Sequence, residues 1–165
     1  MLMRGLREIL GGAALFLGAL ALVASPAVPV SGASSTPRAG QAQAEEPVPA
    51  FHSEVPPGPL PQTLGPEHFD DAVVKNAYHV AARVKKVLYQ QPCYCHCDRS
   101  QGHGSLLDCF VSKHASMCDI CVREDFYAYE QTQKGRTPAQ VRAGIRRGEW
   151  QKVDIAKYQQ YPVKP

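Results

Sequence analysis

The sequence lacks a strong excess of charge of either sign. Its formal net charge is +3, with 18 Lys and Arg residues against 15 Asp and Glu residues, and basic residues never follow one another in more than pairs. Leaving out residues 1–33, which carry Arg4, Arg7 and Glu8, lowers the net charge only to +2. Because nucleic-acid binding depends on a concentrated positive surface, this composition argues against a nucleic-acid partner.

Signatures of several common enzyme and cofactor sites are also missing. There is no glycine-rich phosphate loop and no Ser-His-Asp hydrolase motif, so neither a nucleotide cofactor nor hydrolysis is predicted. Covalent haem attachment needs Cys-x-x-Cys-His, but Val122 follows Cys121. A calcium loop starting at Asp98 needs glycine at its sixth position, where the chain has His103. Chemistry in this chain must come from other residues.

Long apolar runs are rare, and the one near the start of the chain is typical of an export signal. Two arginines precede an uncharged, mostly apolar run over residues 9–23, and small residues then permit cleavage after Ala27 or Ala33. The run is shorter than the ~20 residues of a membrane-spanning helix. Residues 1–33 are predicted to be a signal peptide, with an uncleaved N-terminal anchor as the alternative. We expect an exported protein, in the periplasm or at the outer face of the cytoplasmic membrane.

Residues 34–66 are rich in proline, alanine, serine and glutamine. Such a composition buries too little apolar surface to offset the entropy lost on ordering the chain. We therefore predict a disordered, extended tether that would hold the following domain away from a membrane.

Hydrophobic periodicity predicts a helical domain over residues 67–160. Apolar residues recur at steps of three and four, which places them on one helix face: Val73, Ala77, Val80 and Val84. This helix is predicted over residues 67–89, ended by Pro92, with a break near Arg83 as an alternative.

Three further helices are predicted after the first one. Ser105 opens a short helix, and a longer one runs from about Asp119 to Lys134. Thr137-Pro138-Ala139-Gln140 has the cap residue, the first-turn proline and the third-position glutamine of a helix start. With few strand signals, the predicted fold is a small all-α domain with a cysteine-rich loop packed between helices.

All 6 cysteines lie in one part of this domain: Cys93, Cys95, Cys97, Cys109, Cys118 and Cys121. The first three alternate, so in an extended stretch they would share one face. The last two form Cys-x-x-Cys at the start of a predicted helix, whose N-terminus stabilises thiolates.

Three interpretations of these cysteines remain open. Thiolates with imidazole bind Zn²⁺ or Cu(I), and His96 and His103 are the best candidate co-ligands. Six thiols exceed one four-coordinate site, which favours a polynuclear site, a metal site with a disulfide, or Cu(I). Thiol–disulfide redox chemistry would use the Cys-x-Cys-x-Cys and Cys-x-x-Cys cysteines. The third interpretation is a set of structural disulfides, common in small exported domains.

The motif Pro92-Cys93-Tyr94-Cys95-His96-Cys97 resembles that of a bacterial family named for its PCYCGC motif, also called the CYCXC family. The resemblance extends over about residues 76–150, including Gly102-His103 and Cys118-x-x-Cys121. It implies an exported protein of uncharacterised activity, and selenocysteine in some relatives implies a reactive site. Two differences stand out. His96 replaces the family's glycine, and no cysteine near the signal supports the lipid anchor that many members carry.

Together these observations predict an exported protein that binds a soft metal ion, copper or zinc, for trafficking, storage or protection. The alternatives are a thiol–disulfide oxidoreductase and a disulfide-stapled interaction module. The expected partner is a metal ion or another exported redox or metal protein, with a membrane tether through the N-terminal segment.

Overall fold

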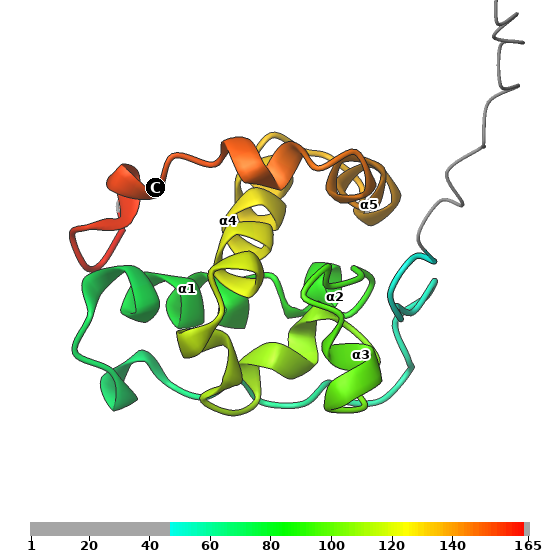
Figure 1. Ribbon diagram of the computed structural model, residues 1–165, viewed down its shortest axis with the longest axis horizontal. Coiled ribbons are helices and arrows are strands. Elements are labelled where there is room, and N and C mark those ends of the chain that lie inside the picture. Colours follow the sequence, from blue (N-terminus) through cyan, green and yellow to red (C-terminus); the bar gives the residue numbers. More distant parts are fainter. Residues whose placement is uncertain (1–46, 164–165) are drawn as a thin grey trace, which may run out of the picture. The chain divides into compact units, whose positions relative to one another are not determined.

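The computed structural model describes residues 47–163, and this part of the chain is helical with no strand (Figure 1). The predicted all-α fold is therefore confirmed. The α-helices are α1 (Ala72–Arg83), α2 (Lys85–Leu88), α3 (Cys97–Ser100), α4 (Asp119–Gln133) and α5 (Pro138–Arg146). Short 3-10 helices connect or follow them: η1 (Pro66–His68), η2 (Leu106–Phe110), η3 (His114–Met117), η4 (Glu149–Lys152) and η5 (Ile155–Tyr158).

Helices α1 and α2 occupy the segment predicted as one helix with a break near Arg83. The Asp71 carboxylate caps α1 by accepting from the Val74 N–H at 2.9 Å. Helix α1 ends at Arg83, and α2 begins at Lys85 after Val84, whose φ of −116° departs from helical values. The break is confirmed, whereas Glu67, the predicted start, lies in the separate helix η1.

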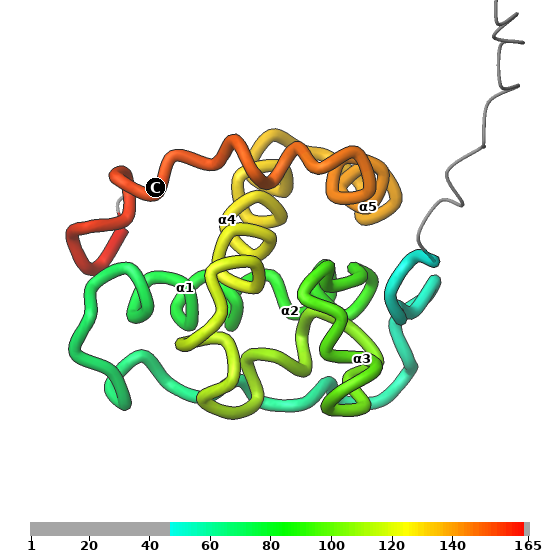
Figure 2. Tube along the Cα trace, viewed as in Figure 1, coloured from blue at the N-terminus to red at the C-terminus, as the bar shows by residue number. Residues whose placement is uncertain are grey.

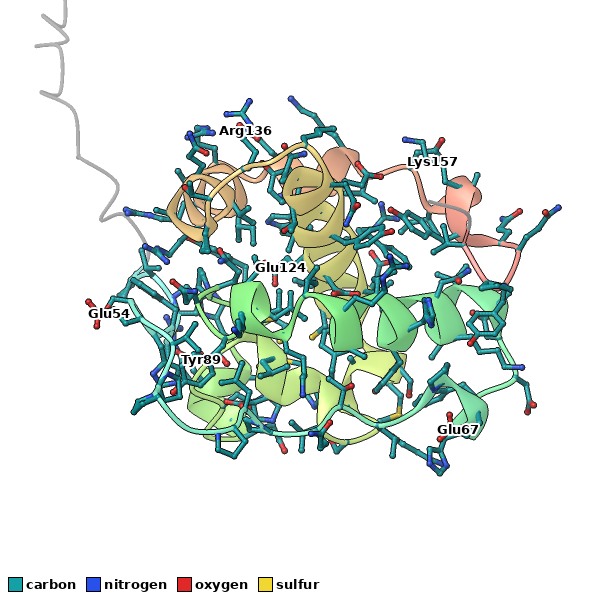
Figure 3. The ribbon with its side chains drawn as sticks, turned by 180° about the vertical axis from the view of Figure 1, so that it is seen from behind. Glu54, Glu67, Tyr89, Glu124, Arg136 and Lys157 are labelled. Atoms are coloured by element: carbon teal, nitrogen blue, oxygen red, sulfur yellow. The ribbon has the colours of Figure 1, made fainter. Side chains whose placement is uncertain are left out.

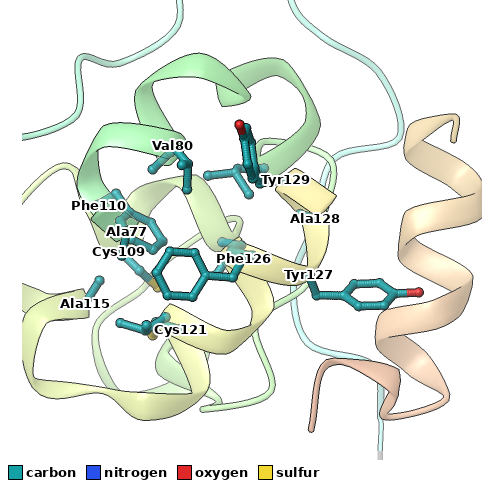
Figure 4. Packing of buried hydrophobic residues seen from close by; sticks show 14 of the residues in the cluster. Ala77, Val80, Cys109, Phe110, Ala115, Cys121, Phe126, Tyr127, Ala128 and Tyr129 are labelled. Carbon is teal, nitrogen blue, oxygen red and sulfur yellow. The ribbon is translucent and has the colours of Figure 1, made fainter. Parts of the chain in front are cut away.

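Helix α4 is the central element of the fold. It contacts α1, α2 and α5 as well as η2, η3 and η4 (Figure 1). The Phe126 ring stacks on Tyr158 with 3.5 Å between ring centroids, and its other neighbours include the buried Cys109 and Cys121 side chains (Figure 4). Burial of such aromatic area is the largest apolar contribution that a single side chain makes to a small core.

Helix α5 begins at the predicted motif. The Thr137 hydroxyl accepts from the Gln140 N–H at 3.3 Å, and the Gln140 side chain accepts from the Thr137 N–H at 3.0 Å. This reciprocal pair satisfies free donors at the helix start. Tyr127 of α4 points toward α5 (Figure 4), and its hydroxyl donates to Glu149 at the start of η4.

Residues 47–66, the last part of the predicted tether, contain no helix or strand before η1 but lie against the helical domain. The His52 ring stacks on Tyr89 at 4.0 Å, and the Leu64 N–H donates to the Phe110 carbonyl at 2.8 Å. Figure 2 traces this segment past α3 toward α1. Its aromatic and leucine side chains give it surface to bury, so the predicted disorder does not extend to these residues.

The predicted signal peptide and the rest of the tether lie outside the described residues. Within residues 47–163, no helix has both the length and the apolar character that crossing a bilayer requires.

Candidate metal centre

The Cys93–Cys97 loop brings alternate sulfur atoms together through a turn. Residues 94 and 95 form this turn, and the His96 N–H donates to the Cys93 carbonyl at 3.1 Å. The sulfurs of Cys93 and Cys95 lie 3.3 Å apart. The prediction of an extended stretch is therefore wrong, although its consequence, a shared direction for the sulfurs, holds.

A left-handed residue ends this turn. His96 has a φ of 56° and a ψ of 33°, and helix α3 begins immediately after it at Cys97. This conformation places Cβ close to the following carbonyl in any residue except glycine. The turn therefore reverses the chain at a position where a side chain is energetically unfavourable.

Cys109 reaches the same cluster from helix η2. The Asp108 carboxylate accepts from the N–H groups of Gly104 and Ser105 at 2.7 and 3.2 Å, which fixes the turn before η2. Cys109 is fully buried, and its sulfur lies 3.4 Å from that of Cys97.

Cys118 and Cys121 enter the cluster from the start of α4. Cys118 is the N-cap residue, and its sulfur accepts from the Cys121 N–H at 3.5 Å. The Cys121 sulfur is fully buried, 3.5 Å from Cys93 and 3.6 Å from Cys95. Figure 4 shows Cys109 and Cys121 on the same side of Phe126, in the middle of the core.

Two imidazoles lie beside these sulfurs. His103 Nδ1 is 3.1 Å from the Cys97 sulfur and 3.3 Å from the Cys109 sulfur. The His114 ring lies 4.9 Å from the His103 ring, and its buried Nε2 has no hydrogen-bond partner within residues 47–163. An unpaired buried nitrogen is costly, so a ligand that engages it would stabilise this arrangement.

The donor atoms form three overlapping groups of four in which all atoms lie within 4.8 Å of one another. The groups are Cys93, Cys95, Cys97 and Cys109; Cys95, Cys109, His114 and Cys121; and Cys97, His103, Cys109 and His114. Ligands at about 2.3 Å from a tetrahedral Zn²⁺ ion lie about 3.8 Å from one another. The donor set thus fits a metal in both chemistry and spacing.

All 6 cysteines are free thiols in the structure. The sulfur–sulfur contacts, 3.3 to 3.6 Å, are far longer than the roughly 2.05 Å of a disulfide bond. Each of Cys93 and Cys95 also has two sulfur neighbours rather than one dedicated partner. A shared cluster of this kind is typical of metal thiolate sites.

The thiols of the cluster differ in pKa. Hydrogen bonds from Cys121 and Cys93 lower the pKa of Cys109 to about 4. In return, hydrogen bonding to Cys109 is the largest cause that raises the pKa values of Cys93, Cys97 and Cys121, and burial adds to it. Without a metal, the buried sulfurs therefore share protons between thiol and thiolate forms. A metal cation would replace those protons.

Glu124 lies one turn after Cys121 on α4 and holds the cysteine loop. It is fully buried, and its two carboxylate oxygens lie 3.0 and 3.3 Å from the Tyr94 N–H, which donates to them. Burial is the largest cause that raises the pKa of Glu124, to about 8. Figure 3 shows Glu124 inside the domain, whereas Glu54 and Glu67 lie at its edge.

Most of the residues predicted from the sequence come together here, and a few do not. Cys93, Cys95, Cys97, Cys109, Cys121 and His103 all belong to at least one four-donor group. Cys118 and His96 belong to none of the groups. Cys118 nevertheless touches the cluster through Cys121.

Sequence reasoning missed two residues of the site. His114 was not among the predicted ligands because it lies on a connector outside any motif, although it is a third histidine among the cysteines. Glu124 was missed because an acidic residue on an amphipathic helix is usually exposed. Its place one turn after Cys121 is the signal that could have identified it.

Fold and site together define a small helical protein with a buried cluster of thiols and imidazoles. The chain belongs to the family described as proteins of unknown function with a PCYCGC motif, which it matches over residues 27–152. None of the curated proteins and none of the solved structures compared with the chain matches it. In the family motif, glycine stands where this chain has His96.

Proposed function

We propose that this protein binds a soft metal ion, copper or zinc, through the cysteine and histidine cluster. The observation that carries the proposal is the presence of groups of four Cys and His donors within 4.8 Å of one another inside a small domain. Thiolate and imidazole are the ligands that Zn²⁺ and Cu(I) prefer.

Burial of the sulfurs supports a metal over free thiols. Cys93, Cys97, Cys109 and Cys121 are each at most 3% exposed. Buried thiols this close stay largely neutral on their own, because thiolates would repel one another and lose their hydration, so they ionise fully only beside a counter-charge. A bound cation supplies that charge, and metal binding then contributes to folding free energy.

The N-terminal sequence supports a location outside the cytoplasm. Its charged start, apolar run and small residues have the pattern of an export signal. We propose that the protein carries, stores or sequesters the metal after export. Outside the cytoplasm, no cytosolic thiol pool competes for copper or zinc. A metal ion or another exported metal protein is the expected partner.

Native mass spectrometry of the mature, exported protein, purified without chelator from an oxidising compartment, tests this proposal. An added zinc or copper mass with most thiols reduced would support it. An apo mass six hydrogens lighter than the reduced chain would mean three disulfides, and the metal proposal would have to be given up.

A thiol–disulfide oxidoreductase is the second candidate, favoured by the half-buried Cys118 at the N-terminus of α4. The Cys121 N–H contact at 3.5 Å and the helix terminus favour a thiolate there. Hydrogen bonding with Cys95 and burial act in the opposite direction and leave the pKa of Cys118 raised. In this reaction Cys118 and Cys121 would form one disulfide, releasing two protons and passing two electrons to an exported disulfide. Reversible loss of two hydrogens upon incubation with oxidised glutathione, in a chain that retains no metal, would support it.

A further inference from the structure

We infer that the cluster holds two metal ions at once, in separate four-ligand sets. One set contains His103 and His114 with two cysteines, and the other consists of the remaining four cysteines. This inference rests on the proposed function, and it adds His114 as a ligand and a stoichiometry of two.

The number of donors gives the first argument. The cluster offers 6 cysteines and the two imidazoles of His103 and His114, which is the complement of two four-coordinate ions. A single four-coordinate ion would bind only half of these donors and leave the others, in or beside the core, with weak sulfur hydrogen bonds alone. Unsatisfied buried polar groups are rare because each costs free energy.

The imidazole set is already assembled in the structure. The donor atoms of Cys97, His103, Cys109 and His114 lie within 4.8 Å of one another. His103 Nδ1 contacts both sulfurs, and His114 Nε2 is buried without a hydrogen-bond partner within residues 47–163. Two thiolates and two imidazoles in this spacing are a tetrahedral Zn²⁺ ligand set.

The remaining cysteines form the second set. Cys93, Cys95 and Cys121 make a triangle of sulfurs with sides of 3.3, 3.5 and 3.6 Å. Cys118 is the remaining thiol of this set: its sulfur accepts from the Cys121 N–H at 3.5 Å at the start of α4. It belongs to none of the four-donor groups already assembled, so the second set is completed when a bound metal draws the Cys118 sulfur toward the triangle. An all-sulfur set favours softer ions than the imidazole set does.

Charge gives a third argument. Six thiolates around one divalent ion would leave four uncompensated negative charges, whereas two divalent ions leave two. Since uncompensated charge in a core is strongly unfavourable, the second ion stabilises full ionisation of the cysteines. The N-terminus of α4 beside Cys118 and Cys121 offsets part of the remaining charge.

The test is zinc stoichiometry, measured by native mass spectrometry on the full chain after titration with Zn²⁺ alone. We expect two zinc ions in the wild type and one in the His103→Ala/His114→Ala variant. The matched control is His68→Ala/His79→Ala, which removes two histidines outside the cluster and should keep two. Nitrogen-15 NMR of the imidazoles should show His103 and His114 shifting upon zinc addition, and His68 and His79 unchanged.

The outcomes separate a failure of the two-ion inference from a failure of the proposed function. One zinc in both the wild type and the His103→Ala/His114→Ala variant would overturn the two-ion inference and leave metal binding intact. Two ions in that variant would overturn the assignment of the imidazoles. No zinc in the wild type, with all thiols free, would overturn the two-ion inference and zinc as the metal, and a repeat titration that also finds no Cu(I) bound would overturn the proposed function itself. If the double variant does not fold by circular dichroism, His114→Gln, at a half-buried position, must show the same loss of one ion.

Discussion

Among residues 47–163, His96 is the one residue other than glycine that has a positive φ, which is 56°. The family motif has glycine at this position. A left-handed conformation costs a residue with a Cβ roughly 1 kcal/mol relative to glycine. Either the fold tolerates the backbone strain at His96, or the residue is retained because its imidazole has a role.

Replacing this histidine separates the two explanations. We expect His96→Gly to raise the free energy of unfolding by roughly 1 kcal/mol, because glycine adopts this conformation without strain. His96→Ala is the matched control, since it removes the imidazole and keeps the strain. Urea denaturation measures both. A loss of zinc affinity in both variants alike would instead identify His96 as a ligand.

The titration of Glu124 should make the free energy of unfolding depend on pH. Its pKa is about 8 in the folded protein and 4.5 in the reference state, with burial the largest cause. Between these values the unfolded chain releases a proton that the folded chain keeps, so stability is fully present below about pH 4.5 and declines as pH rises toward 8. Since each pKa unit corresponds to about 1.4 kcal/mol, the decline amounts to a few kcal/mol.

Glu124→Gln should remove this contribution. The amide oxygen can still accept from the Tyr94 N–H, but the side chain no longer titrates. We expect the metal-free variant to lose less stability than the wild type between pH 5 and pH 8, measured by denaturant unfolding at each pH. Glu67→Gln, whose carboxylate is exposed, should follow the wild type. Parallel curves for the wild type and Glu124→Gln would contradict the burial argument.

At the scale of elements, the contact between α4 and α5 depends on Gly144. A Cβ built on Gly144 would lie 1.8 Å from the Tyr127 hydroxyl and 2.8 Å from Glu149 Oε2. Because the Tyr127–Glu149 hydrogen bond fixes both groups, we expect Gly144→Ala to lower the free energy of unfolding by about 1–3 kcal/mol. Gly58→Ala, with no atom within 4 Å of the new Cβ, is the neutral control.

A second substitution at this contact identifies the cause. Tyr127→Phe removes the hydroxyl nearest to the new methyl group, so adding it to Gly144→Ala should recover part of the lost stability. The coupling is read from a double-mutant cycle of unfolding free energies. Strictly additive effects would show that the hydroxyl is not the obstacle.

The elements differ in how well the sequence predicts them. The start of α5 follows from Thr137 and Gln140 because capping depends on neighbouring residues alone. The turn at Tyr94 and Cys95 was not predicted, because it is fixed from outside by Glu124 on α4. The packing of residues 47–66 likewise depends on distant partners, such as Tyr89 for His52, which local composition does not reveal.

At the scale of the whole molecule, the sequence locates the site but not its arrangement. The clustering of cysteines along the chain already indicates where the chemistry lies. Which donors face one another depends on how η2, η3 and α4 fold around the cysteine loop. Cys109, which lies outside both cysteine motifs, belongs to every four-donor group, whereas Cys118 of the Cys-x-x-Cys motif belongs to none.

Because the metal would bind only the folded cluster, zinc should raise the stability of the whole domain. Zinc at 100 times its Kd stabilises a folded protein by about 2.7 kcal/mol if the unfolded chain does not bind it. For a domain of about 100 residues, that corresponds to a rise in Tm on the order of 10–20 °C. We expect this rise on adding zinc to the metal-free wild type, followed by scanning calorimetry, and its reversal by a chelator.

Two single substitutions then test which cysteine is central. Cys109→Ser should lose most of the zinc-induced rise in Tm, because the serine hydroxyl is a poor ligand in the middle of the cluster. Cys118→Ser, at a half-buried position on the rim, should keep a larger part of it, because it leaves the assembled set of Cys97, His103, Cys109 and His114 intact. Comparing each variant with and without zinc removes the cost of burying a serine, which affects both states. A larger loss in Cys118→Ser than in Cys109→Ser would place the strongest metal site at the start of α4 instead.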